Sequence, residues 1–181
     1  MIPFIVVSVV IALDQISKYI VYTAQPFESF NFIPYILNIT YTTNTGASFG
    51  ILKNHRWVFM SLSTVALVLM AASIIYLMRK KIKNKNMIIS VALALMLGGG
   101  FGNMIDRVLR GYVVDFLEFD FVNFAIFNIA DTFICIGSVL LCICVFMGKY
   151  SLFITPVAVI DKPMENAENT ENIESAGNME N

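Results

Sequence analysis

Three aspartates lie in one short part of the sequence, near the ends of two apolar segments. They are Asp106, Asp115 and Asp131, and the polar residues near them are Asn103, Arg107 and Asn128. The segments on either side are almost entirely apolar. A charge at the centre of a spanning helix costs roughly 2.5 to 3.5 kcal/mol on insertion scales, so acids kept in or beside such helices commonly serve ion, proton or substrate chemistry.

Two carboxylates suffice for peptide hydrolysis if they share one proton, because one then accepts a proton from water while the other donates to the carbonyl oxygen. Asp106 is followed by Arg107, which would hold it ionised and favours a structural role. Asp115 follows an extended run suited to presenting a side chain from a loop. Asp131 opens an apolar segment, three residues after Asn128 and on the same helical face. Asp115 and Asp131 are the better pair, although the same acids would also suit a proton relay or an ion site.

The composition is that of a membrane protein. Of the 181 residues 57% are apolar and 14% are charged, whereas an ordinary globular domain is about 45 to 50% apolar. The net charge of -1 hides a division, since residues 1–148 carry ten basic and seven acidic side chains and residues 149–181 carry two and six. We expect one membrane domain, 1–148, with a disordered cytoplasmic tail, 149–181, rich in Asn and Glu. This charge distribution does not indicate a nucleic-acid-binding surface.

The sequence does not indicate a metal-dependent protease or one with a Ser or Cys nucleophile. It has no His-Glu-x-x-His pair, which excludes a zinc protease of that type, and the lone His55 is not accompanied by a recognisable nucleophile motif. Cys135, Cys142 and Cys144 all fall in the last apolar segment, where we expect small buried side chains. No metal or organic cofactor is implied.

Four apolar segments are long enough to span a bilayer, at about 2–24, 57–78, 87–105 and 127–147. Five basic residues follow the second segment: Arg79, Lys80, Lys81, Lys83 and Lys85. Because short loops rich in Lys and Arg stay in the cytoplasm, both termini should be cytoplasmic, and 25–56 and 106–126 should face outward. The acids then lie at the outer membrane surface.

Smaller features predict how these segments are held together. Asp14 and Lys18 are four residues apart, as in a neutralised ion pair turned toward the bundle. Gly98 and Gly102 have the spacing that lets two helices touch closely. Hydrophobic residues alternate from Ile33 to Tyr41 within 25–56, which predicts a small β element at the membrane surface. The predicted fold is therefore an all-α membrane protein of four spanning helices with a small extracytoplasmic β element.

Five sequence blocks in this order closely resemble the bacterial lipoprotein signal peptidase family, signal peptidase II. They are Asp14-Gln15-x-Ser17-Lys18, Asn44-x-Gly46-Ala47-x-Phe49, Gly102-Asn103-x-x-Asp106-Arg107, Gly111-x-Val113-Val114-Asp115-Phe116 and Phe127-Asn128-x-Ala130-Asp131. Each block is weak by itself, but five in order are specific. One departure is Ser48, where the family usually has Ala beside Phe49.

The resemblance implies an aspartic endopeptidase of the bacterial plasma (inner) membrane, with its active site at the extracytoplasmic face. Its substrate would be a diacylglyceryl-modified prolipoprotein, cut just before the lipidated Cys, in contact with membrane lipid. Asp115 and Asp131 match the catalytic aspartates. The positions that match the surrounding polar site are Asn44, Asn103, Arg107 and Asn128, with Asp14 and Asp106 as supports. Globomycin-type cyclic depsipeptides would inhibit it, and we expect a monomer.

Other interpretations remain open at this stage. A transporter or proton-conducting subunit would also keep acids near a membrane face, and an assembly subunit would explain the glycines alone. The aromatic residues between 116 and 127, together with the β element, suit a clamp over the substrate. They suit equally an aromatic belt at the membrane interface.

Overall fold

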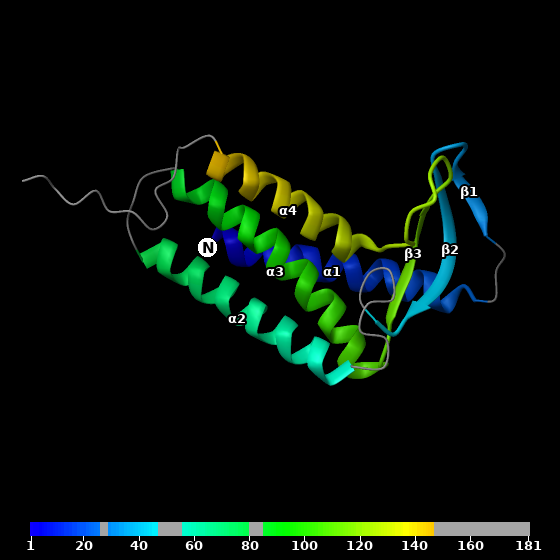
Figure 1. Ribbon diagram of the computed structural model, residues 1–181, viewed down its shortest axis with the longest axis horizontal. Coiled ribbons are helices and arrows are strands. Elements are labelled where there is room, and N and C mark those ends of the chain that lie inside the picture. Colours follow the sequence, from blue (N-terminus) through cyan, green and yellow to red (C-terminus); the bar gives the residue numbers. More distant parts are fainter. Residues whose placement is uncertain (26–28, 47–55, 80–84, 147–181) are drawn as a thin grey trace, which may run out of the picture. The chain divides into compact units, whose positions relative to one another are not determined.

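The computed structural model describes residues 1–25, 29–46, 56–79 and 85–146 (Figure 1). The chain divides into two compact units, Met1–Tyr150 and Ser151–Asn181. The second unit and the predicted tail, 149–181, lie outside the described residues, and so do Ser48 and the basic residues 80–83.

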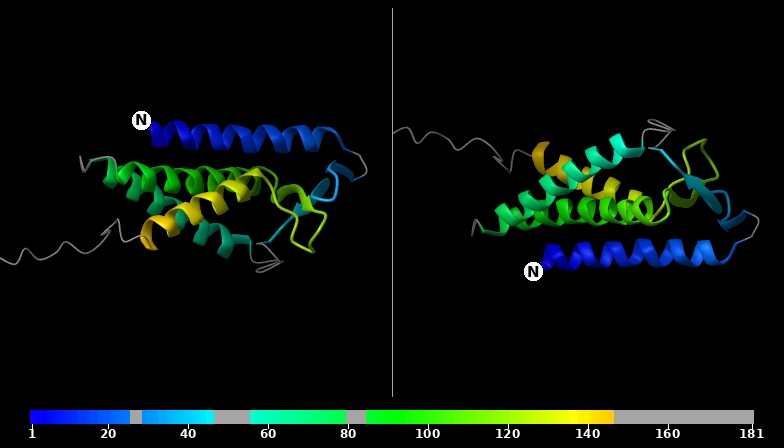
Figure 2. Two further views of the ribbon diagram at one scale, coloured as in Figure 1. Left: turned by 90° about the horizontal axis from the view of Figure 1, so that it is seen from above. Right: turned by 90° about the horizontal axis from the view of Figure 1, so that it is seen from below.

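Four long helices form the membrane part of the described chain: α1 (Ile2–Thr23), α2 (Arg56–Arg79), α3 (Lys85–Leu109) and α4 (Ile129–Phe146). All four are long and apolar enough to cross a membrane, which confirms the predicted spans. Helix α3 contacts the other three, and α1 also contacts α4 (Figures 1 and 2). Residues of α3 therefore have neighbours on several sides.

Helix α3 continues one turn beyond its predicted end at Ile105, as far as Leu109. The added turn carries the charged residues Asp106 and Arg107. The side chain of Asp106 is fully buried and forms ion pairs with Lys18 and Arg110. Because these cations neutralise the carboxylate, the helix can carry it into the protein interior.

Two glycines of α3 bring it close to α1, as predicted. A Cβ atom added to Gly98 would lie 2.8 Å from the Cβ of Val10, and one added to Gly102 would overlap the carboxyl group of Asp14. Larger residues at either position would force the helices apart. A core cluster of buried side chains joins the helices: Leu67, Ile74, Leu77, Ile89, Leu93, Ala94, Leu97 and Cys144.

The cysteine prediction holds for Cys144 and is wrong for the other two. Cys144 is buried, whereas Cys135 and Cys142 are exposed on the surface of α4. Three helices packed around α3 leave much of each outer helix uncovered by protein, and in a membrane lipid replaces the missing protein neighbours.

An antiparallel sheet in the order β1-β2-β3 lies at one end of the bundle (Figures 1 and 2). It consists of β1 (Phe30–Ile33), β2 (Leu37–Asn44) and β3 (Val113–Phe119). The alternation from Ile33 to Tyr41 predicted a β element, but a turn at 34–36 interrupts it. Ile36 N–H donates to Ile33 O at 3.0 Å, and Tyr35 has a φ of 63°. The result is a hairpin.

Strand β3, which carries Asp115, was predicted as an extended loop. Its first four residues, Val113 to Phe116, are all buried, so the strand lacks the alternation of a half-exposed one. Val114 and Phe116 pack against Val21 of α1. This cluster attaches the sheet to the helices and thereby holds Asp115 at the end of the bundle where α3 ends and α4 begins.

Candidate active site

Asp115 occupies a buried position in β3, where its side chain is 2% exposed. Its backbone is paired with Thr42 of β2. The Asn128 side-chain amide donates to Oδ1 of Asp115 at 2.6 Å, and the Asn44 amide donates to Oδ2 at 3.0 Å. Two neutral amides therefore hold both oxygens of this carboxylate.

Asp131 lies in the first turn of α4, where Asn128 is the residue before the helix begins. The Asp131 N–H donates to Oδ1 of Asn128 at 3.0 Å, and the Asn128 N–H donates to Oδ2 of Asp131 at 3.4 Å. This reciprocal arrangement is a capping box. The Asn103 amide of α3 donates to the other oxygen of Asp131, Oδ1, at 2.7 Å. Asn128 therefore contacts both aspartates.

The two aspartates line one cavity of about 420 Å³. Asn44 and Thr132 supply further polar groups, and the rest of the lining is mostly apolar: Phe119, Phe124, Ala125, Ile126, Phe127, Ile134, Cys135 and Ile136. A second cavity, of about 290 Å³, also borders Asp115 and has threonines 42, 43 and 45 in its wall. Asp115 thus stands between an apolar space and a more polar one.

Burial raises the pKa of Asp115 to about 6, and the nearby charge of Asp131 contributes in the same direction. The amides of Asn44 and Asn128 and the charge of Lys18 oppose the rise. The pKa of an isolated Asp is 3.8. A carboxyl group with a pKa near 6 exchanges its proton readily near neutral pH, as acid–base catalysis requires.

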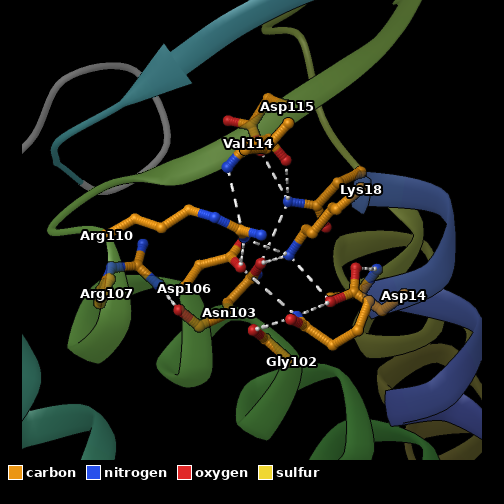
Figure 3. A network of polar contacts seen from close by, with 12 residues as sticks. Asp14, Lys18, Gly102, Asn103, Asp106, Arg107, Arg110, Val114 and Asp115 are labelled. Carbon is orange, nitrogen blue, oxygen red and sulfur yellow. Dashed lines mark hydrogen bonds and ion pairs between the residues drawn. The ribbon is translucent and has the colours of Figure 1, made fainter. Parts of the chain in front are cut away.

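A buried network of ion pairs and hydrogen bonds lies next to Asp115 (Figure 3). The Lys18 ammonium is 2.9 Å from Oδ2 of Asp14 and 3.0 Å from Oδ2 of Asp106. It also donates to Oδ1 of Asn103 at 2.8 Å. The predicted pairing of Asp14 with Lys18 is thereby confirmed.

Asp14 also reaches α4, because the Ala130 N–H donates to its Oδ1 at 3.0 Å. Two further contacts in the network were not predicted. Gln15 donates to Gly102 O at 3.1 Å, and Arg110 forms an ion pair with Asp106.

Arg107 does not take the role that the sequence suggested for it. It was predicted to hold Asp106 ionised, and that role falls to Lys18 and Arg110. Consecutive residues point to different sides of a helix, whereas Arg110 is four residues from Asp106 and shares its side. The Arg107 guanidinium instead donates to Asn103 O and to Gly46 O, both at 3.2 Å. It thus connects α3 with the end of β2.

All eight residues predicted for the site gather at this end of the bundle. Asp115, Asp131, Asn44, Asn103 and Asn128 form one hydrogen-bonded group, while Asp14 and Asp106 lie behind it and Arg107 lies beside it. Their roles in activity stay predictions. The sequence predicts Lys18 only as the ion-pair partner of Asp14, because its contact with Asn103 joins residues 85 positions apart.

Four phenylalanines close to the site form a cluster of rings. Phe119 is the common member, with ring centroids 5.4 Å from Phe121, 6.0 Å from Phe124 and 5.0 Å from Phe127. Phe116, which the prediction grouped with them, is buried against α1. Within the described residues no group of three or more His, Cys, Asp or Glu side chains is arranged to hold a metal ion.

Fold and site together define a multi-pass membrane protein with a buried polar centre at one end of its helices. Residues 6–147 match the family model described as signal peptidase (SPase) II. A lipoprotein signal peptidase of Streptococcus agalactiae serotype Ia is 45% identical over 146 residues, covering 80% of this chain and 90% of that protein. One of Brevibacillus brevis is 40% identical over 148 residues, covering 81% and 96%.

Solved structures agree with this result. A bacterial membrane enzyme determined by the in meso method at 2.3 Å resolution superposes with a TM-score of 0.66 at 34% identity, covering 84% of this chain and 93% of that one. A second such enzyme, at 1.9 Å resolution, gives 0.62 at 36% identity, covering 79% and 91%. The chain belongs to the signal peptidase II family and is therefore a bacterial membrane protein of a protease family.

Proposed function

We propose that the chain is an aspartic endopeptidase that removes the signal peptide from diacylglyceryl-modified prolipoproteins, cutting immediately before the lipidated Cys. The observation that carries this proposal is the convergence of Asp115 and Asp131. They come from a strand and a helix, line one cavity, and each accepts a hydrogen bond from an asparagine amide. The relatives named lipoprotein signal peptidase support the choice of substrate.

In the proposed mechanism the two aspartates share one proton. The ionised carboxylate accepts a proton from a water molecule, which attacks the carbonyl carbon of the scissile peptide bond. The protonated carboxyl donates to the carbonyl oxygen and stabilises the tetrahedral intermediate. The pKa of Asp115, raised to about 6 by burial and by Asp131, suits the member that carries the shared proton. Collapse of the intermediate transfers a proton to the leaving amine of the Cys residue.

The cavity lining suits a lipidated substrate. Phe119, Phe124 and the exposed residue Ile136 give the space beside the aspartates an apolar wall that continues onto α4. An acyl chain or an apolar signal segment entering from the bilayer would keep its hydrophobic surroundings up to the scissile bond. The second cavity, with its threonines, is better suited to a peptide segment leaving toward water.

The proposed orientation has both termini in the cytoplasm and the site at the extracytoplasmic face. Its support is the basic stretch between α2 and α3, because Lys85 begins α3 and Asp106 lies near the other end of this helix. At 1.5 Å per residue these positions are about 30 Å apart, roughly the thickness of the hydrocarbon core. We further propose that residues 1–148 act as a monomer, since the site residues described above all come from one chain.

The direct test changes each aspartate separately to Asn in the purified protein. Cleavage of a diacylglyceryl-modified prolipoprotein, followed by mass spectrometry of the product, should fall by about 10²- to 10⁴-fold in Asp115→Asn and in Asp131→Asn. Asp120→Asn is the matched control, because it removes an exposed carboxylate just beyond β3. It should cleave normally.

Substantial cleavage by either variant of the pair would refute the assignment of catalysis to these aspartates. An independent arm uses globomycin, which should block the wild-type protein by occupying the same cavity. Normal turnover at a saturating concentration of that inhibitor would count against the proposed substrate class.

A further inference from the structure

Lys18 makes one contact more than its ion pairs with Asp14 and Asp106, because its ammonium group also donates to the Asn103 side chain. Its side chain is fully buried in α1, and its ammonium group contacts three acceptors: Oδ2 of Asp14 at 2.9 Å, Oδ2 of Asp106 at 3.0 Å and Oδ1 of Asn103 at 2.8 Å. An ammonium group has three N–H donors and no acceptor. All three donors are therefore used, and one of them is directed to a neutral amide.

That contact determines which way the Asn103 amide faces. Because an ammonium group can only donate, the atom of Asn103 that faces Lys18 must be the oxygen, and this oxygen also accepts from Asn128 at 3.1 Å. The NH₂ group of Asn103 must then point to the opposite side, where it donates to Oδ1 of Asp131 at 2.7 Å. The reversed amide would place its oxygen against the Asp131 carboxylate and its NH₂ group against two donors.

We propose that Lys18 is a positioning residue of the catalytic pair, which orients the Asn103 amide so that Asp131 always receives a hydrogen bond and which favours the ionised form of the pair. This inference rests on the proposed roles of Asp115 and Asp131. The Lys18 cation acts indirectly, because Lys18 contacts Asn103 (Figure 3) and Asn103 in turn donates to Asp131. In the same sense, the positive charge of Lys18 opposes the rise in the pKa of Asp115 that burial and Asp131 cause.

Arg110 provides a matched control within the same network. Like Lys18 it is a cation paired with Asp106, but it binds the other carboxylate oxygen and its guanidinium lies over the ring of Tyr22, 5.5 Å from the centroid. Loss of either cation leaves Asp106 with one partner fewer. Only loss of Lys18 removes the donor from Asn103.

The experiment measures kcat, KM and the pH dependence of kcat/KM for Lys18→Met and Arg110→Met. Lys18→Met should lower kcat by about ten- to hundredfold, the effect of losing one charge-assisted hydrogen bond. Its KM should change little, and the acid limb should move to higher pH by about one pH unit. Arg110→Met should retain the wild-type kcat and pH profile, even if its unfolding temperature falls by as much as that of Lys18→Met.

Between Lys18→Met and Arg110→Met, the other charged groups around the aspartate pair are unchanged: Asp14 from α1, and Asp106 and Arg107 from α3. Lys18→Met leaves the buried network with an excess negative charge and risks misfolding. The double variant Lys18→Met with Asp14→Asn restores charge balance while Asn103 still lacks its donor, and Asp14→Asn alone is its reference. The double variant should show the same fall in kcat and the same shift of the acid limb.

Equal losses of kcat in Lys18→Met and Arg110→Met, or an unchanged pH profile in the folded Lys18 variants, would overturn the proposal. Loss of the fold in both the single and the double variant would do so too, because Lys18 would then be only structural. Failure of the proposed function gives a different result. In that case Asp115→Asn or Asp131→Asn would still cleave, whatever the Lys18 variants do.

Discussion

Asp115 should make the folded protein less stable as the pH rises from about 4 to 7. Burial and the charge of Asp131 raise its pKa to about 6, compared with 3.8 for an ordinary Asp. Between these two values the folded chain binds more protons than the unfolded chain, so the free energy of unfolding falls with increasing pH. The gap between 3.8 and about 6 corresponds to about 3 kcal/mol. Below pH 4 this contribution is fully present, and above the pKa in the folded state it is lost.

Asp115→Asn isolates this contribution, because Asn resembles the protonated form in charge, size and hydrogen-bonding groups. The free energy of unfolding of the variant minus that of the wild type should increase by about 3 kcal/mol from pH 4 to pH 7.5. The variant should be inactive and yet more stable than the wild type at neutral pH, as expected where function requires a strained group. Any pH-independent cost of the substitution cancels in this difference.

The assay is unfolding in detergent micelles at a series of pH values, followed by helical circular dichroism. Asp120→Asn is again measured alongside, because it removes an exposed carboxylate outside the candidate site. A difference that stays flat with pH for Asp115→Asn would refute the reasoning. It would mean that the surroundings of Asp115 do not penalise its charged form.

Three further predictions test single contacts or boundaries. Asn128→Ser keeps a good helix cap but loses the amide that donates to Asp115 at 2.6 Å, so the free energy of unfolding should fall by about 1–3 kcal/mol, the cost of an unpaired buried acceptor, while kcat falls by about ten- to hundredfold; an unchanged kcat would contradict this. A chain ending at residue 148 should cleave like the full chain, because the family match ends at 147, and a large loss of kcat would assign the tail a role. In a cysteine-free background, Tyr35→Cys at the exposed hairpin turn should react with a membrane-impermeant maleimide added to intact cells; reaction only after lysis would reverse the proposed orientation.

The helices were predictable from the sequence because hydrophobic length is a local property. The ends of the helices were harder to predict. The sequence does not reveal that Asp106 forms ion pairs with Lys18 and Arg110, which allow α3 to continue past it. Strand β3 was missed as a strand for a related reason. The buried run around Asp115 has no alternating pattern, and its partner in the sheet, Thr42, is far away along the chain.

The candidate site was predictable in its members but not in its connections. Residue type and position beside apolar segments single out Asp115, Asp131, Asn103 and Asn128, whereas Asn44 is selected only by the resemblance to the signal peptidase II family. The contact between Lys18 and Asn103 follows only from the close packing of α1 on α3, which Gly98 and Gly102 permit. Spacing along one helix indicates which residues share a face, whereas contacts between helices depend on their relative rotation.

Neutral amides contact one pair of aspartates in this site and a cation contacts the other pair, and this difference has a chemical reason. Asparagine amides donate to Asp115 and Asp131, whereas Lys18 pairs directly with Asp14 and Asp106. An ion pair formed directly with a catalytic carboxylate would favour its charged form by much more than an amide does, and the two acids would then share no proton. In the proposed mechanism, neutral donors fix the geometry of the two carboxyl groups and leave the shared proton free to move. Lys18, which contacts Asn103 and neither aspartate of the pair directly, would shift the proton equilibrium without preventing the exchange.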